Sequence, residues 1–321
     1  MSFNIKGDNK VTKLAIVTGG SKGIGLEIVK RLAQEMEVLC ISRSGFDTRE
    51  NPTHHTVHNI EGDDGDLSNP QSALDAFSAW LDVHADYQVS YLIHNAAVLE
   101  LGKTVDLDLE AYNRAMNINV LSPFGITKLI HAKGRFSAQM TGATEKSSVT
   151  YVTSSAAREG TVLEAMGLYS MTKAALNQLA SIQKKELAST GIKVHRVYPG
   201  IVKTGMQTTL RTDPILADDF KDGIGSIPAL EKGDWNGTEA PGNDNRRLVN
   251  AAMSARFVVF TARRSRTEAD AGMPDELDFY TDHEFHRAGY NDTDYIFQKA
   301  VDGAGTHSPG AAASEPASLE M

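Results

Sequence analysis

The first 200 residues alternate between short apolar runs and segments with the periodicity of an amphipathic helix, and this alternation leaves few folds open. Five of the apolar runs are KLAIVTG (13–19), EVLCISR (37–43), VSYLIHNA (89–96), SSVTYVTSS (147–155) and IKVHRVYPG (192–200), and the alternating HHTVHNI (54–60) is expected to be the third strand. Helical spacing fills much of the chain between them, at 25–36, 69–84, 108–140 and 166–189. Mostly apolar strands that alternate with helices are typical of a parallel sheet covered on both faces. The sequence therefore predicts an α/β fold, a doubly wound parallel β-sheet with helices on both faces.

A single domain is expected to span residues 11–300, after a flexible N-terminus at 1–10. Helical spacing returns at 245–264, and ELDFYTD (276–282) has the pattern of a last strand. The end of the chain, 301–321, is small, polar and proline-bearing, and we expect it to be disordered.

Residues 205–245 interrupt the alternating pattern, because they contain many Gly, Asp and Pro residues and show weak periodicity. A segment of this length inside a compact domain is usually a functional lid or an insertion. We expect a substrate-binding lid. Its candidates for an apolar pocket, which could equally pack the lid itself, are Met206, Leu210, Phe220 and Trp235.

The composition argues against several classes of partner. The formal net charge is −9, so neither nucleic acid nor an anionic membrane is an expected partner. No apolar run reaches the roughly 18 residues of a spanning helix, and the polar start MSFNIKGDNKVTK lacks a secretion signal. Cys40 is the only cysteine, lies in an apolar run and is expected to be a buried small residue. These features favour a soluble, reduced, cytoplasmic protein.

A glycine-rich turn, TGGSKGIG (18–25), follows the first predicted strand and opens the first predicted helix. Gly19, Gly23 and Gly25 would let backbone N–H groups approach a phosphate, which the positive end of the helix also attracts. Such glycines also serve packing, and their spacing differs from G-x-G-x-x-G. Their place in the first strand-to-helix turn of a doubly wound pattern favours a Rossmann-type nucleotide site.

The end of the second strand indicates which nucleotide binds. A site for NAD expects an acidic residue there, whereas this chain has Ser42 and Arg43. A guanidinium can bind a 2′-phosphate in a forked manner, and Lys22 adds a second cation, although either cation could be an ordinary surface charge. These residues favour NADPH over NADH. Asp66, after the third strand, could accept from an adenine amino group or be one of several solvated acids.

A second group of polar residues follows the later strands, at the carboxyl edge where ligands bind. Asn95 ends the fourth strand, and Ser154 and Ser155 end the next one. Tyr169 and Lys173 are four residues apart and therefore share one face of a helix. A nearby lysine favours the phenolate and lowers the pKa of a tyrosine, which suits proton transfer to a carbonyl while a hydride arrives on carbon. Each residue alone could equally be a cap, a turn residue or part of a surface ladder.

These motifs together resemble the classical short-chain dehydrogenase/reductase family. The matching pieces are TGGSKGIG (18–25), HNAA (94–97), Asn119 in NINVLSPF, Ser155, Tyr-x-x-x-Lys at 169–173 and PGIVKT (199–204). They occur in family order and cover roughly residues 11–205. Within the family, SSAAREG…LYSMTK and ELDFYTD most resemble carbonyl reductases of the sepiapterin reductase and benzil reductase type.

The resemblance implies an NADPH-dependent reductase that converts a ketone or aldehyde to an alcohol, with no metal. Tyr169 would donate the proton, Lys173 would lower its pKa and bind the nicotinamide ribose, and Ser155 would orient the carbonyl. Asn119 would hold a water that links Lys173 to bulk solvent. The residues expected at the cofactor are Gly19, Ser21, Lys22, Gly23, Ile24, Gly25, Ser42, Arg43, Asp66, Leu67, Asn95, Ala96, Tyr169, Lys173, Pro199, Gly200, Val202 and Thr204.

The chain departs from the family pattern at the serine. Family members commonly place it thirteen residues before the tyrosine, where this chain has Ala156, so Ser155 is one residue further away and Ser154 is the second choice. The ending after the last strand differs too, so a homodimer through the helices around 108–140 and 166–189, or a monomer, is expected. Alternatives to the reductase are an enzyme of this fold without net redox chemistry, such as an epimerase or cyclase, and a non-catalytic NADPH-binding sensor or scaffold.

Overall fold

The computed structural model describes residues 11–139, 147–158, 164–212, 249–264 and 276–279 and contains a seven-stranded parallel sheet. The strand order is β3-β2-β1-β4-β5-β6-β7, and every neighbouring pair is parallel. The strands are β1 (Thr12–Thr18), β2 (Glu37–Ile41), β3 (Val57–Ile60), β4 (Tyr87–His94), β5 (Ser147–Val152), β6 (Ile192–Tyr198) and β7 (Glu276–Asp278). The order reverses between β1 and β4, which is where a doubly wound sheet binds its ligand. The predicted Rossmann-type sheet is confirmed.

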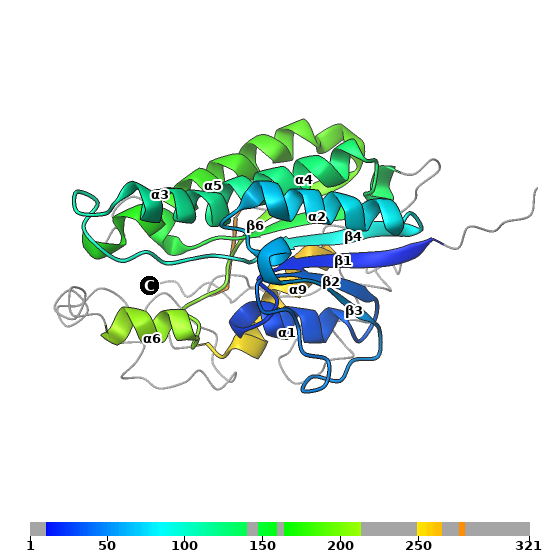
Figure 1. Cartoon of the computed structure of the whole chain (residues 1–321), viewed down its shortest axis with the longest axis horizontal. Helices are drawn as coiled ribbons and strands as arrows, with labels where there is room; N and C mark the ends of the chain where they lie inside the picture. Colours follow the sequence, from blue (N-terminus) through cyan, green and yellow to red (C-terminus); the bar gives the residue numbers. More distant parts are fainter. Residues whose placement is uncertain (1–10, 140–146, 159–163, 213–248, 265–275, 280–321) are drawn as a thin grey trace, which may run out of the picture.

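Helices cover both faces of this sheet (Figure 1). One face carries α1 (Gly23–Leu32) and α9 (Ala251–Arg264), and the other carries α2 (Pro70–Val83), α4 (Ser122–Ala132) and α5 (Gly167–Glu186). Two further helices, α3 (Leu109–Met116) and α6 (Gly205–Thr212), extend beyond the carboxyl ends of the strands. Short 3₁₀ turns lie at 62–65, 137–139, 155–157, 164–166 and 188–190.

The two helical layers pack on two separate cores because successive side chains of a strand point to opposite faces. In β1, Ala15 and Val17 pack in the core beneath α1 and α9, whereas Leu14 and Ile16 pack in the core beneath α2, α4 and α5. All four side chains are fully buried, and burying a Leu or Ile side chain contributes about 1.5–3 kcal/mol. Cys40 belongs to the first core and is fully buried, as predicted.

The helical stretch expected at 108–140 is interrupted by a π-helical turn. Asp108 caps α3 by accepting a hydrogen bond from the backbone N–H of Ala111 at 2.7 Å. The π turn spans Asn117–Leu121 and leads directly into α4. Such turns inside helices frequently mark functional positions. Here the turn carries Asn119, one of the predicted site residues.

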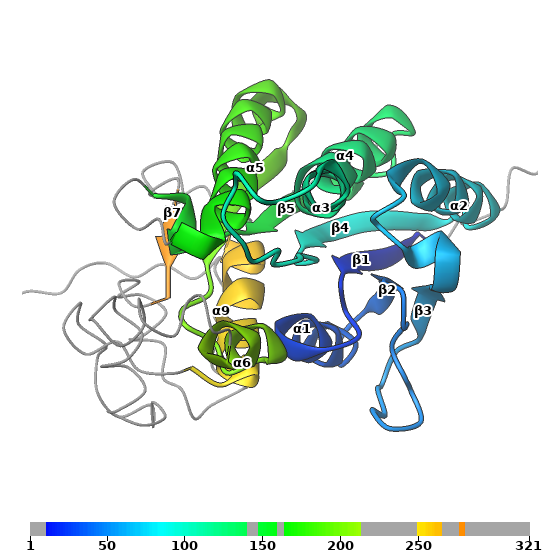
Figure 2. The ribbon, with the colours of Figure 1, turned by 60° about the vertical axis from the view of Figure 1, so that its left-hand side comes forward.

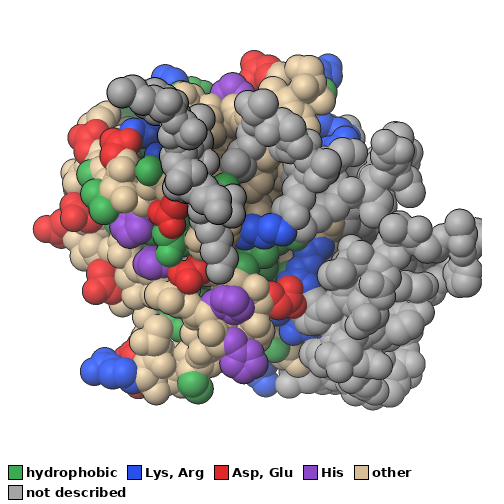
Figure 3. Space-filling view, turned by 90° about the vertical axis from the view of Figure 1, so that its right-hand side faces the viewer, with side chains coloured by type: hydrophobic (Ala, Val, Ile, Leu, Met, Phe, Trp, Pro, Cys, Tyr) green, Lys and Arg blue, Asp and Glu red, His purple; other side chains and the backbone are tan. Residues whose placement is uncertain are grey.

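The opposite end of the sheet, at the amino ends of the strands, exposes histidine and acidic side chains (Figure 3). Glu37 begins β2 and accepts hydrogen bonds from His58 Nε2 at 2.8 Å and from Tyr87 Oη at 3.3 Å. His84 stacks on Trp80, with ring centroids 4.0 Å apart. Within the described residues, no cluster of three or more His, Cys, Asp or Glu is arranged to hold a metal ion. The contacts that hold the amino ends of these strands together are hydrogen bonds and aromatic packing.

Several predictions concern segments outside the described residues. These are the N-terminus at 1–10, the tail at 301–321 and most of the lid, including Phe220 and Trp235. Of the helices in the described ranges, none is long and apolar enough to cross a membrane.

Candidate functional site

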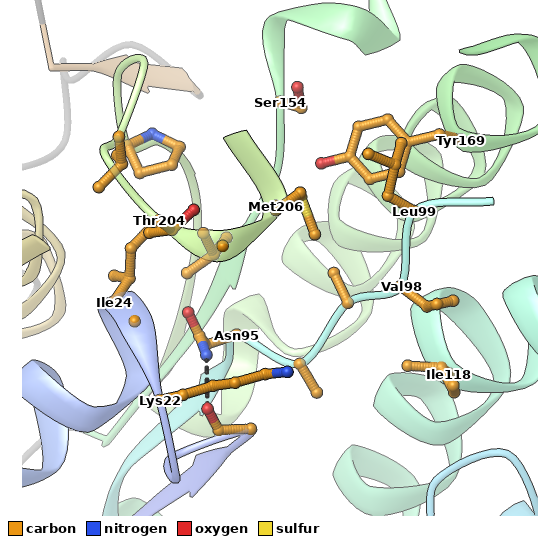
Figure 4. A pocket seen from close by; sticks show the side chains of 18 of the residues that line it. Lys22, Ile24, Asn95, Val98, Leu99, Ile118, Ser154, Tyr169, Thr204 and Met206 are labelled. Atoms are coloured by element: carbon orange, nitrogen blue, oxygen red, sulfur yellow. Dashed lines mark hydrogen bonds between the residues drawn. The ribbon is translucent and has the colours of Figure 1, made fainter. Parts of the chain in front are cut away.

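A cavity of about 1000 Å³ opens at the carboxyl ends of the strands, between the glycine-rich turn and the start of α5. The close-up in Figure 4 shows Lys22 and Asn95 on one side of it and Tyr169 with Ser154 on the other. Most predicted site residues line this cavity. They are Gly19, Ser21, Lys22, Gly23, Ile24, Ser42, Arg43, Asp66, Leu67, Asn95, Ala96, Ser155, Tyr169, Lys173, Pro199, Gly200, Val202 and Thr204. Gly25 and Asn119 are not part of the lining and support it from behind.

The turn between β1 and α1 is held close to the end of β4. Gly19 has a φ of +67°, and a Cβ there would lie 2.8 Å from the Cα of Ala96, so only glycine fits without strain. The side-chain amide of Asn95 donates to the carbonyl oxygens of Thr18 and Gly19, both at 3.1 Å. A side chain at Gly25 would collide with the Gly19 carbonyl and the Asn95 amide. The turn thus brings the positive end of α1 to the cavity, which suits a phosphate.

Two cations line the cavity at the ends of β1 and β2. Lys22 occupies the N-cap position of α1, and Arg43 follows β2. The neighbouring Asp66 accepts a hydrogen bond from the backbone N–H of Ser68 at 2.9 Å, and Leu67 is buried. Because Lys22 and Arg43 both border the cavity, they present positive charge to a ligand at this end. The arrangement fits a phosphate-bearing nucleotide.

Tyr169 lies in the first turn of α5, is only 7% exposed and points its hydroxyl into the cavity (Figure 4). Burial raises its pKa to about 12, and the hydrogen bond with the Ser154 side chain acts in the opposite direction. Ser154, the second choice from the sequence, is thus the serine whose side chain acts on the pKa of the phenol. Ser155 also lines the cavity and begins the 3₁₀ turn that follows β5.

Lys173 lies one helical turn after Tyr169 and is 2% exposed. Its Nζ donates to the Val152 carbonyl at 3.0 Å and lies 5.7 Å from the centroid of the Tyr169 ring. Burial lowers the pKa of Lys173 to about 8. Burial thus raises the pKa of Tyr169, in the opposite direction from the lowering that was expected from Lys173.

Asn119 is fully buried behind this pair. Its Oδ1 accepts from the Val98 N–H at 2.9 Å, and its Nδ2 donates to the Val98 carbonyl at 3.0 Å and to Thr172 Oγ1 at 2.9 Å. Thr172 in turn donates to the Tyr169 carbonyl at 2.8 Å. The π turn thereby ties the loop after β4 to the helical turn that carries Tyr169 and Lys173.

Sequence reasoning missed Tyr198, the last residue of β6, which also lines the cavity. It is 3% exposed, its Oη accepts from the Asn177 side chain at 3.0 Å, and the Arg158 guanidinium lies 4.5 Å from its ring centroid. Its position directly before the motif PGIVKT was the available signal. Sequence reasoning also missed Glu100 and Arg114, which both line the cavity and are joined by a hydrogen bond of 2.7 Å from Arg114 Nε. The two residues are 14 positions apart, so no local pattern reveals their pairing.

Comparison with known proteins gives one consistent family. The model of the family described as short chain dehydrogenase matches residues 13–215. Carbonyl reductase [NADPH] 2 of Sus scrofa is 28% identical over 215 residues, which cover 65% of this chain and 79% of that protein. L-xylulose reductase of Bos taurus is 30% identical over 215 residues, which cover 65% and 80%.

Solved structures agree on the fold. A short-chain dehydrogenase of Burkholderia cenocepacia J2315, in complex with NADP, superposes with a TM-score of 0.60 at 20% identity, covering 84% of this chain and 97% of that one. A short-chain dehydrogenase/reductase of Serratia marcescens gives a TM-score of 0.61 at 24% identity, with the same coverage. At these identities the likeness concerns the fold alone.

Proposed function

Because the chain belongs to the short chain dehydrogenase family, we propose that it is an NADPH-dependent reductase that converts a ketone or aldehyde to an alcohol. It is an NAD(P)-dependent oxidoreductase that acts on CH–OH and C=O groups, as its relatives are. The observation that carries the proposal is the meeting of Tyr169, Ser154 and Lys173 at one end of a cavity whose other end is the glycine-rich turn. The finer likeness to sepiapterin and benzil reductases rests on SSAAREG…LYSMTK and ELDFYTD and stays a proposal.

The glycine-rich turn fits a dinucleotide, since Gly19 and Gly25 leave no room for side chains and α1 points its amino end at the cavity. When bound, NADPH supplies the hydride. Backbone N–H groups of the turn, with Lys22 and Arg43, would hold its phosphates. Pro199, Gly200 and Thr204, which line the cavity after β6, would border the nicotinamide end.

Tyr169 would donate its phenolic proton to the carbonyl oxygen during reduction. With a pKa of about 12 the phenol stays protonated at neutral pH, which is the form that a proton donor needs. Ser154, whose side chain lowers the pKa of the phenol, would hold the substrate oxygen beside it. The cationic form of Lys173 would stabilise the phenolate that remains after proton transfer and so favour donation.

Reduction should depend on the charge of Lys173. Its pKa of about 8 means that the amine is cationic below pH 8 and neutral above it. We therefore expect kcat to be flat between pH 6 and 7.5 and to fall by about tenfold per unit above pH 8. Tyr169, with a pKa of about 12, should cause no further change of kcat with pH below pH 10. A pH profile of kcat at saturating NADPH measures this, and Lys173→Arg, whose charge persists, should remove the fall. A kcat that rises through pH 8 would contradict this role.

Arg43 and Lys22 support a preference for NADPH over NADH. We expect Arg43→Asp to lower the ratio of kcat/KM for NADPH over that for NADH by about 10–100-fold, because a charge-assisted bond to the 2′-phosphate is replaced by repulsion. Initial rates with each cofactor give this ratio. Arg49→Asp is the matched control, since Arg49 is exposed, pairs with Asp47 at 2.8 Å and lies outside the cavity lining. An unchanged ratio in Arg43→Asp would refute this basis of specificity.

A homodimer through α4 and α5 is proposed as the assembly. Leu121 at the end of the π turn, Phe124 on α4, and Met171 and Ile182 on α5 are each 44–46% exposed. Figure 2 shows α4 and α5 in the same outer layer of helices. A contiguous apolar patch can mark an interface, and these four side chains would belong to one across the two helices. Light scattering after gel filtration should give twice the chain mass, and Phe124→Asp with Met171→Asp should give the monomer mass; a wild-type monomer would refute it.

NADPH absorbance at 340 nm, followed with a panel of ketones, diketones and aldehydes, tests the proposed function directly. Consumption of NADPH that requires the carbonyl supports a reductase. Binding of NADPH without consumption favours a sensor or scaffold. Turnover of a sugar-like or cyclic substrate without change in absorbance would instead indicate an epimerase or cyclase of the same fold.

A further inference from the structure

The end of the cavity that contains Tyr169 is lined mainly by apolar side chains from four separate segments. They come from the loop after β4, the turn after β5, the turn before α5, and α6. The cluster that packs with Tyr169 comprises Leu99, Leu101, Ala156, Ala165, Met166, Met206 and Leu210.

Five members of this cluster also line the cavity: Leu99, Ala156, Met166, Met206 and Leu210. Figure 4 shows Leu99 beside the Tyr169 ring and Met206 on the side of its hydroxyl. Met166 and Leu210 are 7% and 9% exposed, so the wall is packed rather than open to water. A substrate whose carbonyl reaches Tyr169 must therefore place its substituents against these side chains.

The charged residues of the described lining have other partners or lie at the opposite end. Glu100 and Arg114 bond to each other, with Arg114 Nε and Nη2 each 2.7 Å from a carboxylate oxygen. Lys173 is turned to the Val152 carbonyl. Lys22 and Arg43 belong to the turn and strand end assigned to the cofactor. Within this lining, the charged side chain beside Tyr169 is Lys173, and its Nζ is bonded to the Val152 carbonyl rather than directed at a phosphate or carboxylate of the substrate.

We infer that the substrate is a ketone or aldehyde with alkyl or aryl substituents, and that sugars, polyols and phosphorylated carbonyls are poor substrates. The inference rests on the proposed reductase function. Beyond the carbonyl oxygen that Tyr169 and Ser154 would hold, hydroxyl or phosphate groups placed against these apolar side chains would lose water without gaining hydrogen-bond partners from them. Two methionines in the wall adapt to different shapes, so several apolar carbonyls of similar size should be accepted.

A homologous series of 2-alkanones tests this class of substrate. With NADPH, kcat/KM should rise by about fourfold for each methylene from 2-butanone to 2-hexanone, the effect of transferring one methylene out of water. Xylulose and dihydroxyacetone phosphate should be at least about 100-fold poorer than 2-hexanone. A kcat/KM that does not rise with chain length, or that is equal for these polar carbonyls, would overturn the inference while leaving the reductase function intact.

Two substitutions of nearly equal size locate the effect at this wall. Met206→Gln introduces an amide and should reduce the rise per methylene to below about twofold, whereas Met206→Leu should preserve it. Leu210→Gln, compared with Leu109→Gln at an exposed position outside the lining, repeats the contrast at a second site. If kcat/KM rises equally per methylene in Met206→Gln and Met206→Leu, the wall is not the cause of the preference for apolar substrates.

Binding separates this inference from the proposed function. Calorimetric titration of the same alkanones into Tyr169→Phe with NADP⁺ measures the apolar site without turnover, and affinity should show the same rise per methylene. If no carbonyl is reduced by the wild type but this rise in affinity is present, the reductase function fails and the apolar site stands. If carbonyls are reduced but neither rate nor affinity rises with chain length, the reductase function stands and the apolar site fails.

Discussion

Replacement of Tyr169 by phenylalanine is expected to lower kcat for carbonyl reduction by about 10²–10⁴-fold, the usual contribution of a positioned general acid. The phenol is protonated at neutral pH, and its hydroxyl faces the cavity beside Ser154. Phenylalanine keeps the ring, which packs with Leu99 and Leu210, so the wall of the cavity should persist. Single-turnover consumption of NADPH measures the loss, and a fluorescence titration should show NADPH affinity within about threefold of the wild type.

Tyr198→Phe is a matched control for this experiment. Tyr198 lines the same cavity and is buried, but its hydroxyl accepts a hydrogen bond from the Asn177 side chain. Loss of that bond costs about 1 kcal/mol of stability and should change kcat by less than about tenfold. Equal losses in the two variants, or a Tyr169→Phe enzyme with more than a tenth of the wild-type kcat, would show that Tyr169 is not the proton donor.

The sheet was predictable because each strand is short, apolar and separated from the next by a helical segment. The period of two in β1 divides Leu14 and Ile16 from Ala15 and Val17, and both sets are buried only if helices cover both faces. Even β7 was predicted from ELDFYTD, although the strand proper spans only Glu276–Asp278. The position of the cavity follows from the same pattern, since the carboxyl ends of parallel strands meet at one edge.

Details that depend on distant contacts were not predictable. The π turn around Asn119 is set by its hydrogen bonds to Val98 and Thr172, which are 21 and 53 residues away. The sequence predicted that Lys173, four positions away, would lower the pKa of Tyr169. That direction was wrong, because burial beneath several segments raises the pKa instead. The lid at 205–245 lies largely outside the described residues, and its role stays a prediction.

The choice between Ser154 and Ser155 also depended on geometry, because spacing alone placed Ser155 closer to the family pattern. In the structure Ser154 adopts an extended backbone and accepts from the Ala156 N–H at 3.2 Å, and its side chain lowers the pKa of Tyr169, whereas Ser155 begins the following 3₁₀ turn. A substrate oxygen placed beside the phenol would therefore meet the Ser154 hydroxyl first. Both serines border the cavity, which makes them a matched pair that differs by one position in the chain.

Ser154→Ala is expected to lower kcat by about 10²–10³-fold, the usual cost of removing one hydrogen-bond donor to an oxygen that gains negative charge in the transition state. Ser155→Ala should lower kcat by less than about tenfold. Ser154→Thr, which keeps a hydroxyl, should recover part of the loss. Steady-state kcat and KM with one ketone measure all three, and the pH profile of Ser154→Ala supplies a second readout. Because the hydrogen bond from Ser154 works against the burial that raises the pKa of Tyr169, its loss should raise that pKa further, so no new limb should appear below pH 10. A larger loss in Ser155→Ala than in Ser154→Ala would return the role to Ser155 and would mean that the turn at 155–157 rearranges when substrate binds.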